Sequence, residues 1–171
     1  KKIKGKKILG VSYCDNKKAF KGITFEKFKK EIKNRQILGV KRRAKYILMN
    51  LSGDKVLIFH LKMTGHIIVV SSKHQVVSGK WAGEGLPPEL QDPRNQFIHL
   101  VLELSGGEIL AFSDMRKFGV IRLENSDYLL SLESKLGPEP LDRKFDLNQF
   151  QKAIEGTNGK IKAVLMDQAR I

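Results

Sequence analysis

Three short segments carry residue types that could bind a polyanion or insert between stacked bases. The first is Arg42-Arg43-Ala44-Lys45-Tyr46, in which three cations and one aromatic ring stand together at the edge of an apolar strand. Arginine offers a planar fork of donors that fits a phosphate group. The alternative interpretation is a solvated turn whose charges serve no ligand.

The second segment is His60-Leu61-Lys62-Met63-Thr64-Gly65. Met63 at a loop tip, next to a glycine that permits a tight turn, would be a flexible apolar side chain able to slide between bases. The alternative is a core methionine that closes a sandwich. His60 taken alone is a structural histidine rather than a ligand.

The third segment is Phe112-Ser113-Asp114-Met115-Arg116-Lys117-Phe118-Gly119. Arg116 and Phe118 are two residues apart on one predicted loop, so an aromatic ring could unstack a base step while the guanidinium bonds an exposed base edge. The alternative is a hairpin loop with Phe118 folded into the core.

Other chemistries find little support in the residue pattern. Cys14 lies in a predicted strand with no evident histidine–acid pair, and Ser105-Gly106-Gly107 is typical of a hairpin turn rather than a phosphate loop. The spacing of His66, His74 and His99 does not indicate a metal site, so no metal ligand is predicted.

The charge distribution favours a nucleic-acid partner. The 171 residues carry 32 Lys and Arg against 18 Asp and Glu, a net charge of +14. Between Lys1 and Tyr46 there are 17 basic and 3 acidic residues, whereas the remainder holds 15 of each. One basic face suits nucleic acid better than an acidic membrane surface, and no apolar run is long enough to predict a membrane span. One cysteine excludes an internal disulfide, and without a signal-peptide pattern a reducing intracellular compartment is expected.

The elements that must position these segments are mostly β-strands. Strands are predicted over residues 7–13, 36–51 with a charged interruption at 41–45, 56–61, 66–70, 97–104, 109–112 and 120–123. Thr24 is typical of a helix N-cap, and Phe25, Phe28 and Ile32 follow at helical spacing. Residues 71–94 are rich in glycine and proline and are predicted to form a long loop.

The tail changes character after this β region. The two prolines of Leu136-Gly137-Pro138-Glu139-Pro140-Leu141 predict a linker. Asp146 is expected to cap a helix that ends at Gly156, and a second helix is expected over residues 160–170.

Taken in order, five blocks resemble the bacterial formamidopyrimidine-DNA glycosylases. They are RRAKY at 42–46, HLKMTG at 60–65, SDMRKFG at 113–119, LGPEPL at 136–141 and LMDQ at 165–168. The fourth block is more similar to that branch than to the related endonuclease VIII branch. The blocks span most of the chain in the family's order and spacing.

The resemblance implies an α+β, mainly β fold. Residues 1–134 would form a two-sheet antiparallel β-sandwich, the catalytic domain without its N-terminal helix. Residues 135–171 would form a linker and the first helices of a truncated helix-two-turn-helix domain. The implied activity is removal of oxidised purines, such as 8-oxoguanine and formamidopyrimidines, followed by strand cleavage at the abasic site. The implied partner is double-stranded DNA that contains such lesions or abasic sites, bound by a monomer in the bacterial cytoplasm, at the nucleoid.

The resemblance also implies a role for individual residues. Met63, Arg116 and Phe118 would fill the gap left by the flipped base, with Arg116 bonding the widowed cytosine. Lys45 would be the proton donor for β-elimination. The expected DNA-binding residues are Arg116, Met63, Phe118, Asn95, Arg42 and Arg43, although Asn95 stands where the family often has histidine.

The family's nucleophile is the amine of an N-terminal proline, next to a glutamate that acts as acid and base. The spacing to Gly5 leads us to expect that the chain is a fragment without these two residues, and therefore inactive as it stands. No cofactor is expected in this chain, although full-length members hold one structural zinc in a C-terminal finger. Two alternatives remain open: a non-catalytic relative that binds damaged DNA, and an RNA- or ribosome-binding β domain.

Overall fold

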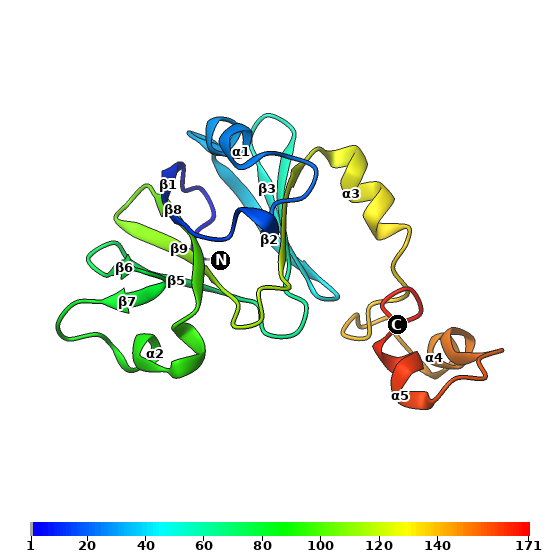
Figure 1. Ribbon diagram of the computed structural model, residues 1–171. Helices are drawn as coiled ribbons and strands as arrows, with labels where there is room; N and C mark the ends of the chain where they lie inside the picture. The colour runs from blue at the N-terminus through cyan, green and yellow to red at the C-terminus, as the bar shows by residue number, and fades with distance from the viewer. Residues whose placement is uncertain (1) are drawn as a thin grey trace. The chain divides into compact units, whose positions relative to one another are not determined.

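Two four-stranded antiparallel sheets build the first part of the protein (Figure 1). The first has the order β1 (Ile8–Cys14), β8 (Ile98–Leu104), β9 (Glu108–Ser113) and β5 (His66–Ser71). The second has the order β10 (Val120–Glu124), β4 (Lys55–His60), β3 (Tyr46–Leu51) and β2 (Ile37–Arg43). The predicted fold class, mainly β with antiparallel sheets, is confirmed.

The computed structural model describes residues 2–171. Contacts divide the chain into one unit that ends at Glu124 and a second unit from Asn125 to Ile171. The sequence placed the boundary at residue 134, which is just past the end of α3 (Ser126–Glu133), whereas contacts group α3 with the second unit.

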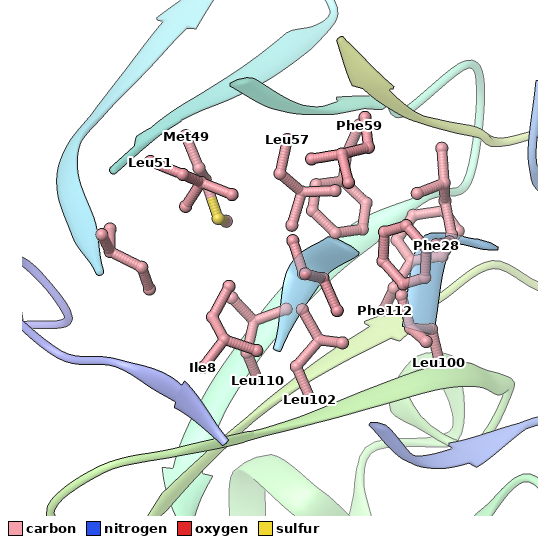
Figure 2. Close-up of a cluster of buried hydrophobic side chains, with 14 of the residues drawn as sticks. Ile8, Phe28, Met49, Leu51, Leu57, Phe59, Leu100, Leu102, Leu110 and Phe112 are labelled. Carbon is pink, nitrogen blue, oxygen red and sulfur yellow. The ribbon is translucent and has the colours of Figure 1, made fainter. Parts of the chain in front are cut away.

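The main hydrophobic core lies between the two sheets (Figure 2). Side chains of β3 and β4, such as Met49 and Phe59, point toward side chains of β8 and β9, such as Leu102 and Leu110. These residues alternate along their strands because successive side chains of a strand point to opposite faces. Packing therefore fixes the register of both sheets, and with it the position of every loop at their ends.

Helix α1 (Phe25–Ile32) packs against this core. As predicted, Thr24 caps it, and its hydroxyl accepts a hydrogen bond from the Lys27 amide at 3.3 Å. Phe28 and Ile32, one helical turn apart, are fully buried. The lysines of the helix lie on its other faces, which keeps the positive charge in solvent.

The segment predicted as a long loop contains regular structure, which corrects that expectation. It holds β6 (Gln75–Val77), β7 (Lys80–Ala82), α2 (Pro88–Gln91) and η2 (Pro93–Asn95). The two strands are joined by Ser78-Gly79, both with positive φ. Each element is too short to show periodicity. The segment is held by burial. Trp81 and Leu90 pack in a second hydrophobic cluster with residues of the first sheet, namely Ile98, Val101, Ile109 and Ala111.

The charged interruption predicted at residues 41–45 is also wrong in part. Strand β2 continues through Lys41-Arg42-Arg43, and only Ala44 and Lys45 form the turn to β3. β2 is the edge strand of its sheet, where charged side chains point into solvent at little cost.

The second unit is helical, with α3, α4 (Leu147–Ile154) and α5 (Ile161–Met166). Asp146 caps α4 as predicted, accepting from the Gln149 amide at 2.8 Å. α5 is shorter than expected because the Asp167 carboxylate accepts from the Ala169 amide at 3.0 Å and draws the chain into a turn. Between residues 2 and 171, no helix is long and apolar enough to cross a membrane.

Candidate nucleic-acid interface

One row of paired residues brings the three predicted segments to the same end of the second sheet. Arg43 of β2 pairs with Tyr46 of β3, Tyr46 pairs with His60 of β4, and His60 pairs with Val120 of β10. The first segment ends at this row with Tyr46, the second starts there with His60, and the third ends one residue before Val120. Residues far apart in the sequence therefore share one edge because the register aligns them.

The first segment is a tight turn. Ala44 has a φ of 49°, and the carbonyl of Lys45 accepts a hydrogen bond from the Leu61 amide at 2.9 Å. The Arg42 guanidinium donates to the Ala44 carbonyl at 2.9 Å. Lys45 and Arg43 are half-buried, and Arg42 is exposed. The bond to Leu61 joins this turn to the start of the second segment.

His60 is a buried structural residue, as the sequence suggested. Its ring meets Tyr46 edge-on, with centroids 4.2 Å apart, and its Nδ1 accepts from the Lys62 amide at 3.2 Å. Burial, followed by the charges of Lys62 and Lys45, lowers the pKa of His60 from 6.5 to about 4. The ring is therefore neutral at physiological pH and adds no charge beneath the two cationic segments.

Asp114 ties the second and third segments together. It is only 1% exposed, and its carboxylate accepts from the Thr64 hydroxyl, from the Arg116 amide at 3.3 Å and from the Gly119 amide at 2.6 Å. A Cβ at Gly119 would collide with the Phe112 ring and with this carboxylate. The loop 114–119 is therefore folded around one buried side chain, that of Asp114, and is fixed against the loop 61–65.

His99 supports Asp114 from below and is itself 4% exposed. Its Nε2 lies 2.9 Å from the Asp114 carbonyl oxygen, and its Nδ1 lies 2.7 Å from a carboxylate oxygen of Asp15. The ring is therefore held on both sides, by a side chain of the residue after β1 and by the backbone of the residue after β9. The first sheet thus contributes a buried support for the loop 114–119.

We call the side chains of Met63, Arg116 and Phe118 the wedge. Met63 is 67% and Phe118 59% exposed, so the alternatives that placed either side chain in the core are wrong. The core position is occupied by Phe112 instead. The Arg116 guanidinium lies 3.3 Å from the Met63 sulfur, and the Arg116 amide donates to the Thr64 hydroxyl at 3.2 Å. Two exposed apolar groups and one cation therefore project from a rigid base.

Asn95 adjoins the wedge through His66. Its amide oxygen lies 2.6 Å from His66 Nε2, and its amide nitrogen donates to the Glu89 carbonyl at 2.5 Å. His66 Nδ1 lies 3.1 Å from the Thr64 carbonyl. A pocket of about 430 Å³ opens here, lined by Met63, Thr64, Gly65, His66, Asp92, Arg94, Asn95 and Met115.

Sequence reasoning assigned no role to the residues that support this site, which are Asp114, His99, Thr64 and Asp15; of these, Asp114 and His99 are buried. One signal was available: Asp114 follows directly on a strand buried at nearly every position, where a carboxylate needs donors. Among residues 2–171, no three His, Cys, Asp or Glu side chains come together as a metal site requires.

Known proteins resemble this chain in sequence and in fold. Residues 1–121 match the model of the formamidopyrimidine-DNA glycosylase N-terminal domain. A formamidopyrimidine-DNA glycosylase from Herpetosiphon aurantiacus is 36% identical over 144 residues, which cover 84% of this chain and 46% of that protein. The chain thus spans about half the length of the curated relatives it matches.

Solved structures of a Lactococcus lactis relative superpose on nearly the whole chain. Its complex with abasic-site DNA has a TM-score of 0.73 at 29% identity, covering 99% of this chain and 56% of that one. Its complex with DNA that contains FAPY-dG has a TM-score of 0.72 at 29% identity, covering 98% and 56%.

Proposed function

The chain belongs to the formamidopyrimidine-DNA glycosylase family, and from this membership and the wedge we propose that it acts in the excision of oxidised purines from DNA. The proposed substrates are 8-oxoguanine and formamidopyrimidines in double-stranded DNA, together with abasic sites. The proposal includes strand cleavage at the abasic site, and a protein that works as a monomer on bacterial chromosomal DNA in the cytoplasm.

The observation that carries the proposal is the wedge on its rigid base. A damaged base inside a duplex must leave the stack before chemistry, which costs a few kcal/mol of stacking and pairing. Exposed Met63 and Phe118 can occupy the vacated space, and the Arg116 guanidinium can satisfy the widowed base. The bonds of Asp114 hold these groups in place before DNA arrives, so little ordering entropy is lost on binding.

Other residues have proposed roles that follow from their places in the family pattern. Lys45, in the turn next to His60, would donate the proton for β-elimination. Arg42, Arg43 and Asn95 would hold backbone phosphates. The nucleophile would be the amine of a terminal proline with its neighbouring glutamate, and no described residue is assigned that step.

Replacing Arg116 with alanine tests the proposal directly. We expect Arg116→Ala to weaken binding to a duplex with an abasic site more than binding to an intact duplex, because only the former has a widowed base to satisfy. Fluorescence anisotropy with both duplexes at one salt concentration measures the two losses. A ratio of the two losses near tenfold corresponds to about 1.4 kcal/mol of discrimination.

Lys117→Gln is the matched control, since it removes one exposed charge from the same loop. A phosphate contact at Lys117 would be lost equally from both duplexes. If Arg116→Ala also weakens both duplexes equally, the wedge does not recognise the lesion, and plain phosphate binding explains the site.

A further inference from the structure

A short basic segment flanks the wedge on the side away from Lys45. We call residues 15–21 the lysine loop; it contains η1 (Lys17–Ala19). Phe20 forms a parallel bridge to Ile121, and the Lys21 amide donates to the Ile121 carbonyl at 3.0 Å. The lysine loop therefore lies along the free edge of β10, next to the point where the loop 114–119 enters that strand.

The order of elements across this end of the molecule follows from the strand pairing. Beyond β10 and the loop 114–119 come β4 with the loop 61–65, then β3 and β2 with the turn at Lys45. The wedge thus has a basic turn on one flank and the lysine loop on the other. At its start, the lysine loop is held by Asp15, whose amide donates to the His99 carbonyl.

Three lysines of this loop face solvent. Lys17, Lys18 and Lys21 are exposed, and none forms an ion pair among residues 2–171. The one acid of the loop, Asp15, is already bonded to His99. Positive charge concentrated at one edge favours a polyanion.

The aromatic ring of Phe25 makes cation–π contacts with two lysines near this edge. Lys17 Nζ lies 5.4 Å and Lys29 Nζ 5.2 Å from the centroid of the same ring. Lys29 pairs with Glu26 at 2.8 Å, whereas Lys17 forms no ion pair among residues 2–171. Over residues 15–21 three lysines stand against one carboxylate, so the lysine loop carries a net positive charge.

A duplex whose groove faces the wedge places one sugar–phosphate backbone on each side of it. We propose that the lysine loop is a second phosphate-binding surface, which holds the DNA strand on the side of the wedge away from Lys45. The inference rests on the proposed function and adds a contact to the second strand. With this contact, both strands of a duplex would be held, one on each side of the wedge. The protein would therefore bind duplex DNA more tightly than single-stranded DNA.

The test compares two triple variants of the 171-residue chain with equal charge change. The first is Lys17→Gln, Lys18→Gln and Lys21→Gln. The control is Lys2→Gln, Lys4→Gln and Lys7→Gln, three exposed lysines at the other end of the sandwich, where Ile8 pairs with Leu104. Anisotropy over a salt series gives the slope of log K against log salt for an abasic-site duplex and for its single strand.

We expect the slope for the duplex to become shallower by about two to three in the lysine-loop variant, since each lost phosphate contact removes about 0.9. We expect little change with the single strand, and little change with either DNA in the control. Because all six side chains are exposed, thermal unfolding should show equal stability of the variants.

Equal slope changes in the two triple variants would overturn the inference while leaving the wedge intact. An equal loss for duplex and single strand would also overturn it, because the loop would then serve the same strand as Lys45. If the unaltered chain binds no duplex even at low salt, the proposed function itself fails, and the inference fails with it.

Discussion

At the scale of single residues, burial decides which polar groups serve structure and which meet the ligand. Asp114, His99 and His60 are buried and fully engaged, whereas Arg116 and Met63 are exposed. The same short segments therefore contain both kinds of residue. A sequence shows the residue types, but the exposed fraction of each side chain comes from the packing around it.

His60 should make the stability of the first unit depend on pH. Its pKa is lowered to about 4 by burial, from 6.5 in the unfolded chain, so the unfolded state binds more protons between these values. The free energy of unfolding is expected to fall as the pH drops from about 6.5 to 4. Urea unfolding of the original chain and of His60→Gln over this range isolates the contribution. A stability difference between the two proteins that does not change with pH would contradict it.

At the scale of elements, the connections between the sheets depend on one carboxylate. The loop 61–65 leads from β4 to β5, and the loop 114–119 leads from β9 to β10. The Asp114 carboxylate accepts hydrogen bonds from both loops, so the two loops that connect the sheets are expected to move as one unit. The rigidity of the wedge is therefore a property of two loops together rather than of either alone.

Asp114→Asn should loosen both loops at once. The amide has the same shape but lacks one acceptor oxygen, so it leaves a buried amide or hydroxyl unpaired, at a cost of about 2 kcal/mol. Chemical denaturation measures the loss. The matched control is Asp54→Asn in an exposed turn, which removes the same charge and should change stability by less than about 0.5 kcal/mol. Similar values for both variants would mean that Asp114 does not anchor the loops.

At the scale of the whole molecule, the interface uses the ends of the sheets rather than their faces. The inner faces of the two sheets are occupied by core packing. The cations at this end come from the end of β2, from the loops 61–65 and 114–119 and from the lysine loop. A β-sandwich is well suited to this because its registers hold loops from distant parts of the sequence at one edge. The second unit is a separate helical body.

A polypeptide of these 171 residues is expected to bind DNA without forming a covalent bond to it. In the proposed mechanism the nucleophile is the amine of a terminal proline, and none of the described residues is assigned that step. Borohydride reduction in the presence of an 8-oxoguanine duplex should give no adduct on a denaturing gel. A mobility shift under the same conditions verifies that the duplex is bound. A trapped adduct would contradict the assignment of the nucleophile to a terminal proline.

The sequence by itself determined the strands of the two four-stranded sheets, apart from the extent of β2. It also determined the caps of α1 and α4, the basic first quarter and the three segments 42–46, 60–65 and 113–119. Each of these features depends on residues that are close in sequence, through side-chain alternation, capping hydrogen bonds or local charge. The tertiary structure alone decided that the three segments meet, that Asp114 is shared between two loops, and that Asp15 and His99, 84 positions apart, support it. It also decided that residues 75–82 form a hairpin, because its short strands are stabilised by the burial of Trp81 rather than by their own pattern. Contacts over such separations depend on the register of paired strands and on core packing, and neither quantity is present in any single stretch of sequence.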